Sequence, residues 1–185
     1  MYLGITRAIY ERYKDIVLTA DVMFVNGIAF LVTLSRGIRL YTTEHLPNRK
    51  KDQLARLLKK TTNLYARGGF RVRTMMMDME FEKVKKQEGM ELVDVNTTAA
   101  REHVGEIERG IRYLKERCRC SVSTLAMAGI KYVAKPIVIR LVYNVVVLVN
   151  AVPDPLGVSE RYSPREIVTQ RKFDFKRDCR VQFGA

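Results

Sequence analysis

The stretch "DIVLTADVMFVNGIAFLVTLSRGI", residues 15–38, decides the fold. Two runs rich in β-forming residues flank Asn26-Gly27, the dipeptide that favours a type I′ turn between antiparallel strands. The pattern therefore predicts two strands, over residues 16–25 and 28–36, joined by a tight hairpin. The next segment, "RLYTTEHLP", predicts a third short strand that stops at Pro47.

Helical and strand patterns alternate after the hairpin. Leucines three and four positions apart predict a helix from Asp52 to Arg67, which Gly68-Gly69 ends. "FRVRTMMM" predicts a fourth strand that ends at Asp78, and "ELVDV" predicts a fifth. The remaining elements are helical: one long helix that contains residues 102–120, a second over about 131–151 with a kink at Pro136, and a short last helix that starts at Ser163 or Pro164.

This order predicts an α/β fold with a mixed five-stranded sheet, three strands antiparallel and two parallel, flanked by helices. No internal repeat or linker-like segment divides the sequence, so we expect one domain. Its core is expected over residues 1–152. Residues 153–185 are expected to form a downstream loop, a short helix and a basic tail.

Composition favours a polyanionic partner. The chain has 185 residues, of which 47% are hydrophobic, and a formal net charge of +13. Such an excess of Lys and Arg suits nucleic acid or an anionic membrane. The most apolar stretch, residues 129–153, is interrupted by charged residues, and its uncharged part is too short to span a bilayer. We therefore expect a nucleic-acid partner and no membrane role.

Cysteine and histidine add little. Three cysteines are an odd number, which argues against a disulfide framework and fits a reducing, intracellular location, the nucleus or cytoplasm. With only His45 and His103, no spacing matches a structural zinc site.

The predicted helix "EHVGEIERGIRYLKERCRC", residues 102–120, carries two stripes. Its apolar stripe recurs at steps of three and four and predicts the buried face. A second stripe, about 100° around the axis, is basic except for Glu108. The ordinary interpretation is a Glu108–Arg112 surface pair, worth about 0.2–0.5 kcal/mol.

Two aspartates suggest another interpretation of Glu108. Asp21 lies inside the predicted first strand and Asp78 ends the fourth, although a solvent-facing position and a turn residue are the ordinary explanations. If the first strand is central and the fourth lies beside it, the two aspartates can be neighbours and the helix of Glu108 can pack across the same edge. Three such carboxylates repel each other unless a cation such as Mg²⁺ or Mn²⁺ joins them.

At these residues the sequence resembles the integrase catalytic core of long-terminal-repeat retrotransposons, closest to the copia type. The segments "TADVMFVNGIAFLVTLSR", "VRTMMMDMEFEKV" and "HVGEIERGIRYLKE" resemble the three acid-bearing segments of that family. "GVSERYSPREIVTQRKFDF" resembles the segment that follows such cores. The resemblance implies a ribonuclease-H-like fold and a catalytic, metal-binding triad of Asp21, Asp78 and Glu108.

The resemblance also implies partners. These are Mg²⁺ or Mn²⁺, DNA in the form of retroelement ends and target DNA, and further copies of the chain in a homo-oligomer. The phosphate backbone would be held by basic residues of the same helix: Arg101, Arg109, Arg112, Lys115 and Arg119.

The sequence departs from the family pattern in two places. The second motif lacks the usual Asn-Gly after the aspartate, and Asp78 and Glu108 are only thirty positions apart, less than is customary. Glu106 competes with Glu108 as the third acid, but the two point in different directions on a helix. The sequence thus supports a metal-dependent polynucleotidyl transferase, with a catalytically degenerate module that binds nucleic acid or itself as the alternative. A ribonuclease H shares the fold and chemistry but lacks the integrase-like motifs.

Overall fold

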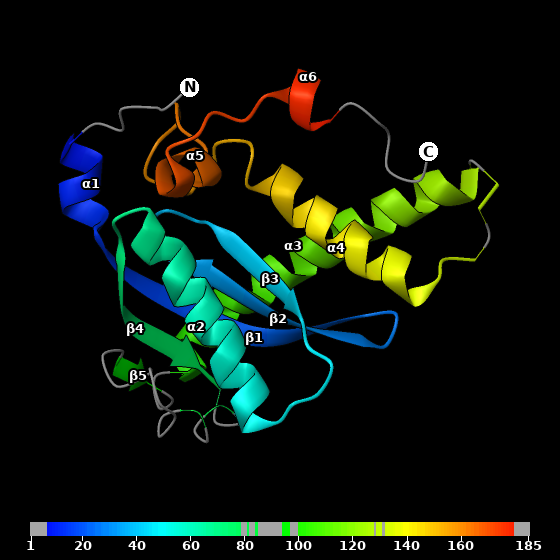
Figure 1. Ribbon diagram of the computed structural model, residues 1–185, viewed down its shortest axis with the longest axis horizontal. Coiled ribbons are helices and arrows are strands. Elements are labelled where there is room, and N and C mark those ends of the chain that lie inside the picture. Colours follow the sequence, from blue (N-terminus) through cyan, green and yellow to red (C-terminus); the bar gives the residue numbers. More distant parts are fainter. Residues whose placement is uncertain are drawn as a thin grey trace.

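Five strands form one mixed sheet in the order β3-β2-β1-β4-β5, flanked by helices (Figure 1). The computed structural model describes residues 7–78, 81, 84, 94–96, 100–127, 129–130 and 132–179. The strands are β1 (Asp15–Val25), β2 (Ile28–Ser35), β3 (Tyr41–His45), β4 (Arg71–Met77) and β5 (Asp94–Asn96). The helices are α1 (Arg7–Tyr13), α2 (Lys51–Arg67), α3 (Ala100–Met127), α4 (Lys135–Val149), α5 (Pro164–Thr169) and α6 (Phe175–Asp178).

The central strand is β1, as the family resemblance implies. It pairs antiparallel with β2, which pairs antiparallel with β3, and it pairs parallel with β4, which pairs parallel with β5. At the hairpin both Asn26 (φ 47°) and Gly27 (φ 73°) have positive φ, as a type I′ turn requires. The predicted α/β class, strand order and hairpin are therefore confirmed.

Side-chain alternation along β1 divides the interior into two cores. Ile16, Leu18 and Ala20 face a core shared with α2 and α5. Met23, on the opposite face, belongs to a core shared with α3 and α4. Figure 1 shows α2 in front of the sheet and α3 behind it. We call these two sides the α2 side and the α3 side.

Some predictions about helices were wrong. Pro136 lies in the first turn of α4 and causes no kink. Backbone N–H groups in the first turn of a helix make no intrahelical hydrogen bond, so the N–H that proline lacks is not missed there. The helix therefore starts at Lys135, later than predicted. The short helices α1 and α6 were not predicted at all. None of the helices in the described parts of the chain is long and apolar enough to span a membrane.

Helix α5 docks on the end of α2. The Ser163 hydroxyl accepts a hydrogen bond from the Glu166 N–H, and the Glu166 carboxylate accepts one from the Ser163 N–H, which completes a capping box. Ile167 and Val168 are then buried in the core on the α2 side. The close approach is possible because residue 68 is glycine: a Cβ there would lie 2.1 Å from the Val168 carbonyl oxygen.

Substituting Gly68 with Ala should therefore destabilise the protein. The added methyl meets backbone that cannot rotate away, so we expect a loss of about 1–3 kcal/mol of unfolding free energy, measured by chemical denaturation. Gly105→Ala is the matched control. The nearest atom to its new methyl is a flexible Arg109 nitrogen at 4.0 Å, and replacing a helical Gly should add up to about 1 kcal/mol. A Gly68→Ala protein as stable as wild type would contradict the packing of α5 on α2.

Candidate active site and nucleic-acid interface

Asp21 lies in the middle of the central strand and faces the α3 side. It pairs across the sheet with Val32, which belongs to the core on that side. Its Oδ1 accepts a hydrogen bond of 2.6 Å from the Val22 N–H, which fixes the orientation of the carboxylate. The side chain is partly buried. A carboxylate in this position has access to solvent only from the α3 side of the sheet.

Asp78 follows the end of β4 directly. In the parallel register Ala20 pairs with Met77, so Asp21 and Asp78 occupy the next position on each of two adjoining chains. Ala20 and Met77 both face the α2 side, and strand alternation turns the following residue of β1 to the α3 side. Asp78 itself is exposed. The register thus places the two aspartates directly after paired residues of adjoining strands.

Glu108 lies on α3, the helix that covers β1 on the α3 side. Four residues of the predicted apolar stripe are buried, Ile107, Ile111, Leu114 and Cys118, whereas the Val104 side chain lies outside the described residues. Glu108 lies exposed beside this stripe. Among the residues that the structure describes, no three Asp, Glu, His or Cys side chains are grouped so as to hold a metal ion. Among the described residues, Asp21, Asp78 and Glu108 therefore do not form a three-ligand site.

Glu106 has a different environment. Its carboxylate accepts a hydrogen bond from the Arg36 Nε at 3.0 Å and a very short one from the Arg39 Nη1. The Arg39 side chain is 12% exposed and also forms an ion pair with Asp154, with 3.5 Å between Nε and Oδ2. We call these four residues the Glu106 clasp. It ties α3 to the loop after β2 and to the loop after α4.

The clasp could not be predicted from the sequence because Arg36 and Arg39 lie 70 and 67 positions from Glu106. Asp154 belongs to a different loop. The only local signal is the tight turn around Gly37 (φ 76°) and Arg39 (φ 66°), which aims the arginine at α3. That turn indicates a loop but does not indicate a partner.

The predicted basic stripe lies on the exposed side of α3. Arg109, Arg112 and Arg119 are exposed and Lys115 is partly buried, whereas the Arg101 side chain lies outside the described residues. Near the hairpin the stripe borders a groove of about 480 Å³. Its walls come from the tip of the hairpin and from α3: Phe24, Val25, Asn26, Lys115, Cys118, Arg119, Val122 and Ser123. This surface suits the backbone of a nucleic acid.

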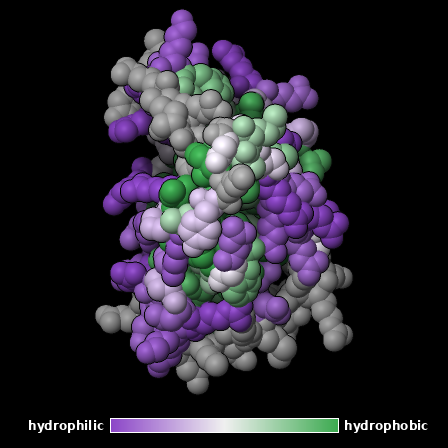
Figure 2. Space-filling model, turned by 90° about the vertical axis from the view of Figure 1, so that its right-hand side faces the viewer, coloured by the Kyte–Doolittle hydropathy of each residue, from purple (hydrophilic) through white to green (hydrophobic). Residues whose placement is uncertain are grey.

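Figure 2, which views the molecule from the right-hand side of Figure 1, shows hydrophilic side chains framing smaller hydrophobic areas. On α4, Ile137 is 42% exposed and Val147 is 41% exposed. These apolar side chains lie on the helix that covers β3 and packs beside α3.

Comparisons with known proteins identify the fold. No protein-family model and no curated protein matches the sequence. Among solved structures, the catalytic core domain of BIV integrase is similar, with a TM-score of 0.55 and 18% sequence identity over 82% of this chain and 92% of that chain. The chain therefore has a ribonuclease-H-like fold of the kind found in integrase cores, as the resemblance implied.

The thiol of Cys118, at the base of the groove beside the hairpin, should be inert. Burial raises its pKa to about 11, so the reactive thiolate is almost absent at pH 8. Cys120 and Cys179 are exposed. We expect iodoacetamide at pH 8 to alkylate those two within minutes and Cys118 only after denaturation, as peptide mass spectrometry would show. Rapid labelling of Cys118 in the folded protein would mean that α3 does not pack on the sheet as described.

Proposed function

We propose that this protein is a metal-dependent polynucleotidyl transferase of the integrase type, which cleaves DNA ends and transfers them to a second DNA strand. Asp21, Asp78 and Glu108 are its proposed catalytic acids. The observation that carries the proposal is the parallel register, in which Asp21 and Asp78 follow the paired residues Ala20 and Met77 on adjoining chains. The similar solved structure is that of an integrase catalytic core, and the proposal extends that activity to this chain.

The donor set suits Mg²⁺ or Mn²⁺. Carboxylate oxygens are hard ligands, and Mg²⁺ is commonly held by one or two carboxylates together with water and substrate phosphates. Two adjoining aspartates therefore suffice to begin a site, and Glu108 would complete it from α3. Bound there, divalent ions would activate an attacking oxygen and stabilise a leaving oxygen.

The chain's own residues have separate roles in this proposal. The hydrogen-bonded β1 fixes Asp21, so its carboxylate needs little reorganisation when the substrate binds. Arg109, Arg112, Lys115 and Arg119 on α3 would hold the phosphate backbone beside the acids. The sequence resemblance to copia-type cores makes retroelement ends and target DNA the proposed substrates. The exposed apolar side chains of α4 would support self-association of the chain.

Glu106 is the weaker candidate for the third acid. Its two arginine partners already compensate its charge and hold it toward the β2–β3 loop, on the other side of α3 from Glu108. Releasing it to bind a metal ion would leave the largely buried Arg39 with Asp154 as its remaining ion-pair partner. We therefore assign Glu108 to the site and Glu106 to the clasp.

The second candidate function is a catalytically degenerate module that binds nucleic acid or a copy of itself. It is favoured by the lack of a three-carboxylate group among the described residues. The two candidates differ in one observable, which is cleavage of DNA in the presence of Mn²⁺.

Glu108→Gln should abolish Mn²⁺-dependent cleavage and leave DNA binding intact or stronger. The change removes a metal ligand worth several kcal/mol in the transition state, which at about 1.4 kcal/mol per tenfold predicts a loss of 100-fold or more. It also relieves repulsion against phosphate. Cleavage of a labelled duplex and a gel-shift assay would measure the two effects.

Glu116→Gln is the matched control, because Glu116 is an exposed carboxylate on the same helix. It should cleave like wild type.

Glu106→Gln should lower the melting temperature yet retain cleavage below that temperature. Loss of cleavage in Glu106→Gln alone, with Glu108→Gln active, would move the third acid to Glu106. If wild-type protein cleaves no DNA with Mn²⁺, the degenerate module is the better description.

Arg112→Ala combined with Lys115→Ala should make DNA binding less sensitive to salt. Each lost phosphate contact makes the slope of log affinity against log salt shallower by about 0.9, so the pair should change it by about 1.8. Fluorescence anisotropy over a range of salt concentrations would measure the slope. An unchanged slope would assign the α3 stripe to solvation alone.

A further inference from the structure

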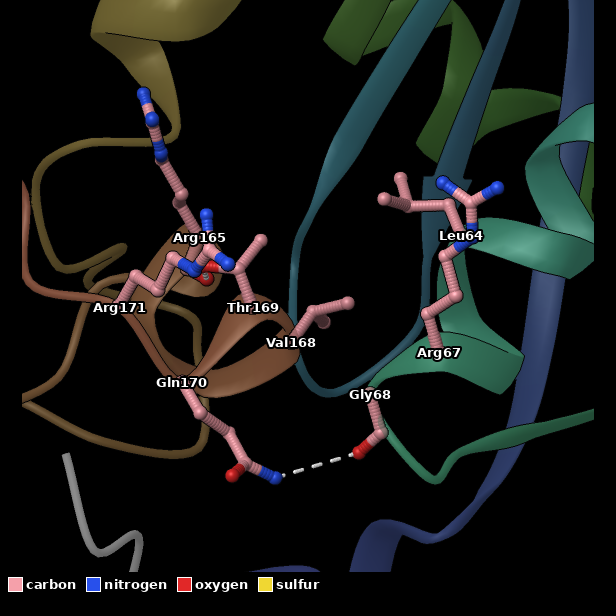
Figure 3. Close-up of a pocket in the computed structure, with 8 residues that line it drawn as sticks. All are labelled: Leu64, Arg67, Gly68, Arg165, Val168, Thr169, Gln170 and Arg171. Atoms are coloured by element: carbon pink, nitrogen blue, oxygen red, sulfur yellow. Dashed lines mark hydrogen bonds between the residues drawn. The ribbon is translucent and has the colours of Figure 1, made fainter. Parts of the chain in front are cut away.

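A second basic surface lies on the α2 side, away from the acids. Figure 3 shows its central pocket, between the end of α2 and α5, with a volume of about 460 Å³. Arg67 lines it from α2, Arg165 lines it from α5, and Arg171 lies two residues beyond the end of α5. Gln170 closes one end by donating a hydrogen bond of 3.5 Å to the Gly68 carbonyl oxygen.

Two arginines of this pocket, Arg67 and Arg165, have no carboxylate in direct contact among the described residues. Asp178, on the nearby α6, forms its ion pair with Arg177 and interacts with the charge of Arg165 only at longer range. Arg165 is held in place by stacking on the Phe173 ring, 4.9 Å from its centroid. Ordered guanidinium groups without carboxylate partners are suited to bind an anion.

The pocket continues along α2 into a second cavity of about 460 Å³, which shares Leu64 and Arg67 with the first. Arg56, Lys59 and Lys60 line that cavity at helical spacing, and Lys60 is ion-paired there with Glu44 at 2.6 Å. From Arg56 to Arg67 the row is about 16 Å long, at 1.5 Å per residue. A single small anion cannot span such a row, whereas a nucleic acid carries a charge every 3.4 Å or so along each strand.

We propose that this surface, the α2–α5 groove, binds the phosphodiester backbone of a nucleic-acid segment. Between its cations lie hydroxyl and amide side chains that commonly contact phosphate: Thr42, Asn63, Thr169 and Gln170. An acidic protein is the less suitable partner. Lys is depleted in protein–protein interfaces, and their centres are usually formed by buried aromatic residues, which the groove does not offer.

The segment bound there is distinct from the one at the acids. The core residues of α2 and α5 face one side of the sheet, and those of α3 and α4 face the other. Duplex DNA is stiff over about 150 base pairs, so one short duplex cannot bend around the domain to contact both surfaces. The proposal rests on the α2–α5 groove alone and does not require that the acids are catalytic.

Protection from phenylglyoxal, which modifies arginine, tests the proposal on the unaltered full chain. A short duplex of random sequence should protect Arg67 and Arg165 from labelling, as measured by peptide mass spectrometry. Arg161 is the internal control: it is exposed, stacks on Tyr162 and lies outside both cavities, so its labelling should not change. Inorganic phosphate at the same total phosphate concentration should protect neither groove arginine.

A variant adds a second measurement. Arg67→Gln combined with Arg165→Gln should make the salt slope of DNA binding shallower by about 1.8, whereas Arg161→Gln should leave it unchanged. Three outcomes would overturn the proposal. DNA could fail to protect both arginines, inorganic phosphate could protect them as well as DNA does, or a polyaspartate peptide could protect them where DNA does not, which would indicate an acidic protein partner. Failure here would leave the α3 surface and the cleavage assay unaffected.

Discussion

The hydrogen bonding of β1 to a strand on each side is the constraint on which the rest of the structure depends. Because β2 and β4 occupy both edges of β1, its residues can face only the α2 side or the α3 side. Alternation then assigns each residue to one of two cores, and a shift of one residue would exchange them. Asp21 faces the α3 side for this reason alone.

An aspartate is a poor strand former, and a partly buried charge is costly. Its presence in the central strand is the kind of local conflict that is expected at functional positions.

The sequence predicted the elements whose patterns are local. The Asn26-Gly27 dipeptide determined the hairpin, and the spacing of Ile107, Ile111 and Leu114 determined the buried face of α3. Pro136 was misjudged because a proline suits the first turn of a helix as well as a kink, and only the tertiary position of α4 decides between them. The strand order was predicted through the family resemblance, since pairing β1 with β4 depends on contacts far apart in the sequence.

The candidate site was predictable only in part. The neighbouring positions of Asp21 and Asp78 follow from the strand order. The different environments of Glu106 and Glu108 do not follow from the sequence, although two positions on a helix differ by about 200°. The difference arises because the turn at Gly37 brings Arg36 and Arg39 to one side of α3. Removing Glu106 would leave Arg39, which is only 12% exposed, with Asp154 as its remaining ion-pair partner, and a buried charge that loses its closest partner is costly. The clasp therefore helps to fix the rotation of α3, and with it the direction in which Glu108 points.

Charge has two separate uses in this molecule. Arg36 and Arg39 are paired with carboxylates and connect parts of the fold, whereas Arg67 and Arg165 have no such partner among the described residues. A net charge of +13 opposes the compact state through self-repulsion, and unpaired arginines in a groove add to that cost. A polyanion bound to the folded protein offsets the repulsion and adds its own binding free energy, about 2.7 kcal/mol at a ligand concentration of 100 times Kd. A basic surface of this kind is thus destabilising for the free protein and stabilising for the complex, which is a physical reason to expect that the unpaired arginines serve a ligand rather than the fold.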